Sequence, residues 1–118
     1  MIRMLKENQI FVFGSNLAGY HAAGAAFQAK KKFGAVEGIG EGITGRCYAL
    51  PTLDKNLGKF SDEDFYKHVL KFRKCAEARP GLEFLLTKIG CGIAGYSEEY
   101  VKEKFKKVTK NVVKPKGW

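Results

Sequence analysis

The sequence has few of the residues that mark a disulfide-linked, metal-binding or membrane-spanning protein. Cys47, Cys75 and Cys91 are an odd number of cysteines with no C-x-x-C pair, so we expect neither a disulfide framework nor a zinc site. His21 and His68 are too few histidines to assemble a metal-ligand cluster from spacing. No apolar run approaches the roughly 20 residues that cross a bilayer. We therefore predict no metal, no cofactor and no membrane partner.

The N-terminal residues carry no sign of a targeting segment. Residues 1–8 lack the apolar stretch and the small-residue cleavage site of a signal peptide, which predicts a cytoplasmic protein. The chain has 118 residues, of which 45% are hydrophobic and 28% charged, and this composition favours one ordered domain over residues 1–118. We expect residues 113–118 to form a loosely held tail.

Acidic residues are scarce relative to basic ones. Twenty-one Lys and Arg against twelve Asp and Glu give a net charge of +9. Such a surface attracts polyanions, either nucleic acid or a phosphorylated small ligand. Most of the excess is lysine on predicted helix faces rather than arginine interleaved with aromatic residues, and that pattern also fits a surface that is simply solvated.

Apolar segments alternate with helical patterns along the chain. Residues 9–13 are a continuous β-branched and aromatic run, typical of a strand buried on both faces. Phe65, Val69, Phe72 and Ala76 recur at helical spacing and predict one apolar helix face. The expected strands are 9–13, 46–50, 82–89 and an edge strand at 111–113, and the expected helices are 22–32, one opening at Ser61 and one capped by Ser97. This alternation predicts an α/β fold, a three-layer α/β/α sandwich with a mixed central sheet.

Glycine and proline mark the expected ends of these elements. Gly34 is placed as the C-terminal cap of the first helix, and Pro51 as the end of the second strand. The four glycines within 38–45 predict a loop beside a short strand near Val36. We expect residues 53–60 to be the most mobile loop.

Two glycine-rich turns, 14–24 and 90–95, each join a buried strand to a helix. A helix N-terminus presents unpaired N–H groups and a partial positive charge, and glycines let backbone amides approach an anion closely. Both turns follow the carboxyl ends of strands, where open α/β sheets bind ligands. Together they predict an anion-binding cleft for a nucleotide pyrophosphate, although each turn alone also fits ordinary turn geometry. Neither is a Walker A sequence or a dinucleotide-binding fingerprint.

Three segments, in the same order, resemble the motifs of macro domains. Residues 10–16, followed by 24–26, are similar to the strand that ends in the family's asparagine-containing loop and to its glycine-rich turn. Residues 40–42 and 48–51 resemble its Gly-Glu-Ala segment and the strand after it. Residues 84–96 resemble a later strand and the Ser-Thr-Gly-Ile-Tyr-Gly-Tyr loop that follows it.

The resemblance implies a macro-domain fold that binds ADP-ribose and, in some members, hydrolyses ADP-ribosyl bonds or related esters. It implies that Asn16 contacts the distal ribose, that the loop 90–95 surrounds the pyrophosphate, and that Tyr96 packs near the distal ribose. Ala23 and Gly24 fall in the segment near the phosphates. The predicted ligand-binding residues are Gly14, Ser15, Asn16, Ala23, Gly24, Glu41, Gly90, Cys91, Gly92, Ile93, Ala94, Gly95 and Tyr96.

The chain departs from the family at three places. Phe13 stands where the family has the first asparagine of its pair, and Ala23 stands where some hydrolytic members carry an acid. Residues 1–9 contain no Gly-Asp-Ile segment, which in the family places an aspartate on adenine. The resemblance therefore carries the fold and the phosphate loops further than it carries adenine recognition or hydrolysis.

Asn16, His21 and Cys91 are the candidate catalytic residues. A histidine at position 21, just before the first helix, suits a general base or a phosphate contact, and it also fits a plain surface loop. Cys91, beside Lys88 at a helix N-terminus, would have a lowered pKa and act as a nucleophile, or it is a small residue that fits between glycines. Glu41, between two glycines, either orients a water or a ribose hydroxyl or is an ordinary loop acid.

Two functions from different classes fit these patterns. The leading hypothesis is a domain that binds ADP-ribose or a related phosphorylated nucleotide, with hydrolysis of an ADP-ribosyl or phosphoester bond as its reaction if it is an enzyme. The alternative is a small basic nucleic-acid-binding module, in which the lysines of 30–32 and 102–110 contact phosphates.

Overall fold

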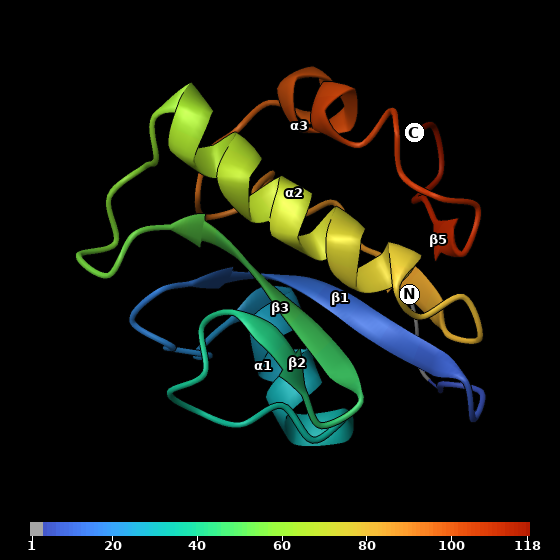
Figure 1. Ribbon diagram of the computed structural model, residues 1–118. Helices are drawn as coiled ribbons and strands as arrows, with labels where there is room; N and C mark the ends of the chain where they lie inside the picture. The colour runs from blue at the N-terminus through green and yellow to red at the C-terminus, as the bar shows by residue number, and fades with distance from the viewer. Residues whose placement is uncertain (1–3) are drawn as a thin grey trace.

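A five-stranded sheet forms the centre of the molecule (Figure 1). Its strand order is β2-β3-β1-β4-β5. The computed structural model describes residues 4–118, and within them no helix has the length and apolar character needed to span a membrane. In chain order the elements are β1 (Gln9–Asn16), α1 (Gly24–Lys32), β2 (Gly42–Thr44), β3 (Cys47–Leu53), α2 (Asp62–Glu77), β4 (Glu83–Leu86), α3 (Glu98–Lys104) and β5 (Val112–Val113).

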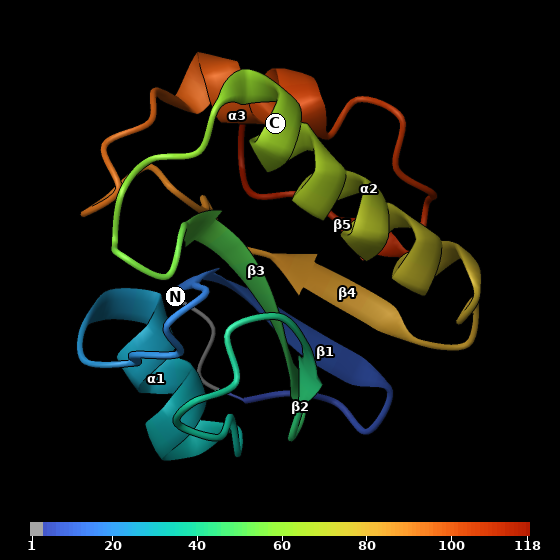
Figure 2. The same ribbon diagram turned by 60° about the vertical axis from the view of Figure 1, so that its left-hand side comes forward.

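Strand β1 is the central strand, and it pairs in parallel with β3 on one side and with β4 on the other. β5 continues the parallel pairing beyond β4, whereas β2 and β3 form an antiparallel pair at the other edge. α1 covers one face of the sheet, and α2 and α3 cover the opposite face (Figure 2). The predicted three-layer α/β/α architecture with a mixed central sheet is therefore confirmed.

The apolar face of α2 packs onto the sheet as its spacing predicts. Phe65, Val69, Phe72 and Ala76 are all buried, and the Phe72 ring lies 5.0 Å from the ring of Tyr48 in β3. Burial of one such phenylalanine contributes roughly 1.5–3 kcal/mol relative to an exposed side chain. α2 is therefore the principal cover of this face.

On the opposite face, the shorter helix α1 packs against β1 and β3 through small side chains. Ala26 and Ala29 are buried, and the Phe33 ring at the end of the helix lies 5.0 Å from the ring of Phe11. Gly34 follows with a φ of +81°, so it terminates the helix as predicted. The alanines let α1 lie close to the sheet, and this packing positions its N-terminus.

Strands β1 and β3 are longer than predicted, because pairing rather than composition decides where they end. β1 continues beyond residue 13 to Asn16, and β3 runs past Pro51 to Leu53 as its partner. A proline cannot donate a backbone hydrogen bond. β2 pairs with β3 only as far as Ala49. On the side of β3 to which the Pro51 nitrogen turns, no neighbouring strand therefore needs a hydrogen-bond donor at this residue.

Three other boundaries also differ from the predictions. β4 ends at Leu86 rather than at residue 89, because the chain turns after Thr87, where the Ile89 N–H donates to the Thr87 carbonyl oxygen at 2.8 Å. α1 begins at Gly24 rather than at residue 22. The predicted loop 38–45 contains β2, and no strand forms near residue 36 in the described part of the chain.

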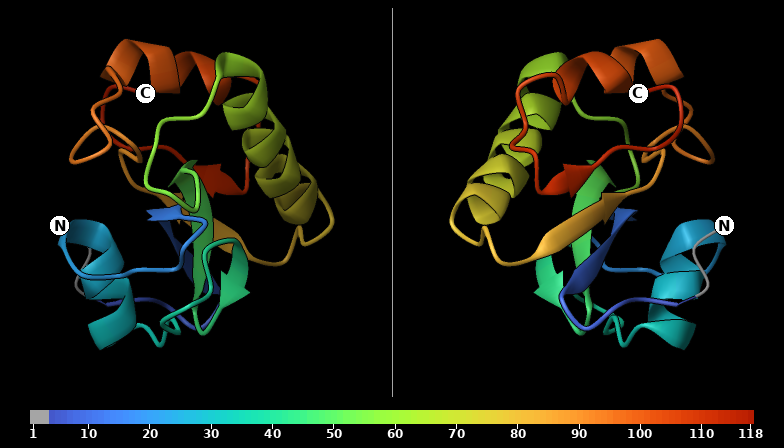
Figure 3. Two further views of the ribbon diagram at one scale, coloured as in Figure 1. Left: turned by 90° about the vertical axis from the view of Figure 1, so that its left-hand side faces the viewer. Right: turned by 90° about the vertical axis from the view of Figure 1, so that its right-hand side faces the viewer.

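The C-terminal segment returns beside α3 (Figure 3). The Trp118 indole N–H donates to Glu98 at 3.3 Å, and the Trp118 ring lies 6.2 Å from the ring of Phe105. These contacts hold the end of segment 113–118 against α3 and its C-terminal cap. The sequence predicts that this segment is loosely held.

Ser61 caps α2, because its side-chain oxygen accepts a hydrogen bond from the Asp64 N–H at 3.1 Å. We expect Ser61→Ala to lower the free energy of unfolding by about 1 kcal/mol, since that N–H loses its partner. Urea denaturation followed by circular dichroism measures the change. Ser61→Asp keeps an acceptor at the cap and is the control. Equal stability of Ser61→Ala and the unaltered chain would contradict this contribution.

Candidate functional site

A cleft of about 510 Å³ opens at the carboxyl ends of β1, β3 and β4. Its walls come from both glycine-rich turns, the start of α1 and the end of β3. Glu41, Cys91, Gly95 and Tyr96 do not line it. The predicted ligand-binding residues that do line it are Gly14, Ser15, Asn16, Ala23, Gly24, Gly90, Gly92, Ile93 and Ala94.

The N-terminus of α1 faces this cleft and has no cap. Ala23 stands at the cap position without a side-chain acceptor, and no acidic residue occupies the first turn. The amides of Gly24, Ala25 and Ala26 have no hydrogen-bond partner among residues 4–118. The other two helices are capped by serines and carry acids in their first turns. α1 therefore presents unsatisfied N–H groups and the positive end of its dipole to the cleft.

The loop after β4 presents a second set of free amides. The N–H groups of Gly92, Ile93 and Ala94 also lack a partner within the described residues, and all three residues line the cleft. Gly90 turns the chain with a φ of +72°, and its carbonyl oxygen accepts a hydrogen bond from the Tyr96 N–H at 2.8 Å. Successive backbone donors in a turn are a recurrent anion-binding arrangement.

Gly14 lets the two turns approach each other. A Cβ atom at this position would lie 3.2 Å from the Gly90 nitrogen and 3.5 Å from Ile89, so a larger residue would press β1 against the loop. The backbone of Gly14 does not have a positive φ, so close approach rather than conformation explains the glycine. The distance between the two sets of amides therefore depends on this contact.

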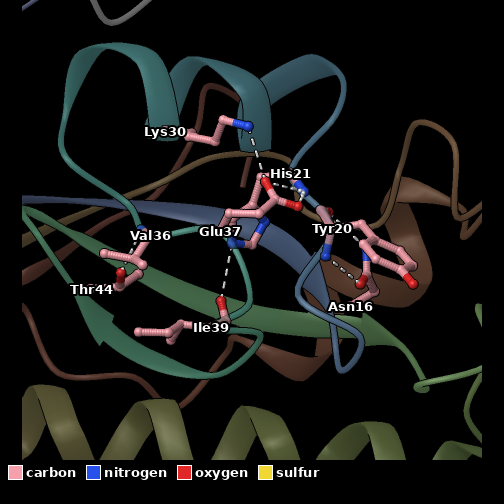
Figure 4. Close-up of polar contacts among 8 residues, drawn as sticks. All are labelled: Asn16, Tyr20, His21, Lys30, Val36, Glu37, Ile39 and Thr44. Atoms are coloured by element: carbon pink, nitrogen blue, oxygen red, sulfur yellow. Dashed lines mark hydrogen bonds and ion pairs between the residues drawn. The ribbon is translucent and has the colours of Figure 1, made fainter.

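Asn16 lines the cleft, and both polar atoms of its side chain are already engaged (Figure 4). Its Oδ1 accepts from the Tyr20 N–H at 3.1 Å, and its Nδ2 donates to the Tyr20 carbonyl oxygen at 3.0 Å. This pair of bonds closes the first turn between the end of β1 and α1. Asn16 thus shapes the turn that leads into the helix N-terminus.

The structure places His21 outside the cleft, behind this turn. Its side chain is fully buried, and its Nε2 lies 3.0 Å from the Ile39 carbonyl oxygen, so Nε2 is the donor. Its Nδ1 is buried without a hydrogen-bond partner, and its ring meets Phe13 edge-on at 5.2 Å. The backbone N–H of His21 donates to the Glu37 carboxylate, which also pairs with Lys30 at 3.1 Å (Figure 4). His21 therefore attaches the first turn to the segment before β2.

Cys91 also points away from the cleft. Its Sγ donates to the Ile89 carbonyl oxygen at 3.4 Å, and its side chain packs against the core under α2 and α3. α3 begins only at Glu98, so Cys91 is not at a helix N-terminus. Burial raises the pKa of the Cys91 thiol and Glu98 raises it further, which outweighs the opposing charge of Lys88. The expectation of a lowered pKa is therefore wrong.

Tyr96 supports the second turn from the core side. Its ring stacks on Phe65 at 5.1 Å. Its hydroxyl donates to the Thr52 carbonyl oxygen at 3.0 Å and accepts from the Phe60 N–H at 3.2 Å. Gly95, next to it, has a carbonyl oxygen that accepts from the Lys59 ammonium at 3.2 Å. Both residues anchor the loop without lining the cleft.

Glu41 pairs with side chains of α2 instead of facing the cleft. Its Oε2 lies 2.6 Å from Nδ1 of His68, and its Oε1 accepts from Lys71 at 3.3 Å. Glu41 and His68 are both largely buried, and Lys71 is exposed. This pair connects the segment before β2 to α2.

Lys88 is a cleft residue that is not among the site residues predicted from the sequence, where it appears only as a neighbour of Cys91. It lines the cleft just before the second turn, and its ammonium pairs with Glu98 at 3.1 Å. Both side chains are about half exposed. A lysine two residues before a glycine-rich turn was the signal that could have identified it.

Comparison of the chain with protein-family models, with curated proteins and with solved structures finds no match.

We expect His21→Ala to destabilise the protein by about 2–4 kcal/mol. The substitution leaves a cavity beside Phe13 and removes the donor that satisfies the Ile39 carbonyl. Urea denaturation measures the loss. Tyr20→Ala is the control, since it removes the neighbouring ring, which is 60% exposed, and its effect should stay near about 1 kcal/mol or less. Equal losses for the two variants would contradict the supporting role of His21.

Proposed function

We propose that the chain binds ADP-ribose or a related nucleotide through its diphosphate group. The observation that carries the proposal is the convergence of two sets of unpartnered backbone amides on one cleft. Those of 24–26 come from the start of α1, and those of 92–94 come from the loop after β4. One phosphate would accept hydrogen bonds from each set.

The charge distribution supports an anionic ligand. Lys88 lines the cleft, and no Asp or Glu lines it among residues 4–118. The chain as a whole carries a net charge of +9. An anion in the cleft thus meets the positive end of the α1 dipole and no carboxylate among the lining residues, and it competes with Glu98 for the Lys88 ammonium.

The size and lining of the cleft support a nucleotide rather than an inorganic anion. A volume of about 510 Å³ lies within the usual range of small-molecule sites, roughly 300–1,000 Å³. Besides the amides, the walls include the side chains of Leu53, Leu57 and Ile93. A ligand with a charged centre and less polar ends suits this lining, and the resemblance to macro domains supports ADP-ribose.

We propose that the cleft binds a nucleotide, and we assign no hydrolytic reaction to it. Of the three candidate catalytic residues, Asn16 lines the cleft, whereas His21 and Cys91 lie behind its two walls. No histidine, cysteine or carboxylate lines it within the described residues. General acid–base chemistry on an ADP-ribosyl or phosphoester bond would need a group of that kind within hydrogen-bond reach.

The nucleic-acid alternative receives less support from the geometry. The lysines of 30–32 lie in α1, on one face of the sheet, and those of 102–110 lie in and after α3, on the other face (Figure 1). Lys30, Lys104 and Lys106 also pair with carboxylates of the chain. The two lysine clusters therefore do not form one continuous surface.

Ala22 is exposed at the mouth of the cleft, next to the α1 N-terminus, and it provides a test of anion binding. We expect Ala22→Asp to weaken ADP-ribose binding at least about tenfold, because a carboxylate there repels the diphosphate. Ala22→Lys should strengthen it. Isothermal titration calorimetry measures both affinities, and unfolding midpoints show whether the fold is unchanged.

The control is Gly81→Asp, which adds the same charge at an exposed position before β4, at the opposite end of that strand. We expect it to leave the affinity unchanged. Absence of heat with the unaltered, folded chain at high micromolar concentration would contradict the proposed function. Retention on DNA or RNA that weakens steeply with salt, without ADP-ribose binding, would favour the nucleic-acid alternative.

A further inference from the structure

No helix of residues 4–118 lies over half of the sheet face that α1 occupies. One row of paired residues crosses this face from Cys47 through Phe11 and Leu85 to Val113. α1 covers the first two, since the Cys47 thiol lies 3.8 Å from the Ala29 carbonyl oxygen and Phe11 packs beneath Phe33. Leu85 is only partly buried and Val113 is 42% exposed.

A second cavity, of about 480 Å³, lies over this uncovered half, and we call it the side groove. It is bounded by α1 on one side and by residues 113–116 on the other, with Phe11 and Leu85 among its lining residues. Ala25 and Thr87 line both the side groove and the cleft. The two cavities are therefore neighbours that share the first turn of α1 and the residue after β4.

Two lysines stand at the rim of the side groove. Lys114 and Lys116 line it, and neither forms an ion pair or a hydrogen bond with any residue of 4–118. Lys88, in the cleft, is by contrast paired with Glu98. The side groove thus combines an apolar lining with two unneutralised positive charges.

We propose that the side groove binds the base and ribose of the nucleotide whose diphosphate occupies the cleft. We further propose that Lys114 and Lys116 select a nucleotide with an additional phosphate on that ribose. This inference rests on the proposed function. Because the two cavities share lining residues, one nucleotide can reach both of them. The apolar lining of the side groove suits a planar base, and its two lysines complement a phosphate.

A second copy of the chain is a less favourable occupant of this face. A two-fold symmetric contact places the same patch on both subunits. Lys114 and Lys116 of each copy would then lie close to those of the other, with no carboxylate of the described residues bound to them. Repulsion between like charges disfavours such a contact.

The first experiment compares ADP-ribose with its derivative phosphorylated on the adenosine 2′-hydroxyl, by isothermal titration calorimetry. We expect the phosphorylated ligand to bind about tenfold more tightly. The double variant Lys114→Ala, Lys116→Ala should lose this preference and keep its affinity for ADP-ribose. The matched control, Lys107→Ala with Lys110→Ala, removes two exposed lysines outside the side groove and should keep the preference.

The second experiment tests the apolar part of the side groove. Val113→Glu should weaken the binding of ADP-ribose about tenfold, because it places a charge where the base would lie. Ile43→Glu is the matched control, since Ile43 has the same 42% exposure and also lies in an edge strand, β2, away from the side groove. The affinity of the Ile43→Glu variant for ADP-ribose should match that of the unaltered chain.

The outcomes separate this inference from the proposed function. If Ala22→Asp weakens ADP-ribose binding while the Val113 and lysine variants leave affinity and preference unchanged, the side-groove proposal is overturned and the proposed function stands. If no nucleotide binds, both are overturned. A stable dimer in analytical ultracentrifugation that Val113→Glu converts to monomers would assign the face to a second copy and would also overturn the inference.

Discussion

The candidate site depends on the parallel pairing of β1 with its neighbour β4. Because both strands run in the same direction with Val12 opposite Leu86, the turns that follow them leave the sheet at the same end, the carboxyl ends of the strands. Gly14 then lets the end of β1 lie against the second turn at Gly90 without a side chain between them. Two turns whose first glycines, Gly14 and Gly90, lie 76 residues apart in the sequence are thereby placed on opposite walls of one cleft. An antiparallel arrangement would have put the two turns at opposite ends of the sheet.

The contacts around the cleft hold its polar backbone in place before any ligand binds. Asn16 closes the first turn, and the buried ring of His21 attaches that turn to the segment before β2. Tyr96 supports the second turn from the core through Thr52. Each of these side chains bonds other parts of the protein and leaves the amides of 24–26 and 92–94 free. A ligand bound in the cleft would therefore meet donors that were already ordered during folding, which favours affinity.

The sequence allowed the architecture to be predicted because its signals are local and periodic. The α2 face and the Ser61 cap follow from spacing, and the glycine-rich turns follow from composition. The end of β3 beyond Pro51 could not be predicted, since it depends on which strand lies alongside. The directions of Cys91 and Glu41 could not be predicted either, because side chains in irregular turns follow no period and take their direction from tertiary packing.

Backbone amide NMR spectra recorded during the addition of ADP-ribose test the central claim most directly. If the two turns hold the diphosphate, the amide signals of 24–26 and 92–94 should shift together, with the same dependence on ligand concentration. Hydrogen bonding to phosphate oxygens should move them downfield. Shifts confined to the lysine clusters of 30–32 and 102–110, with both turns unaffected, would contradict the claim.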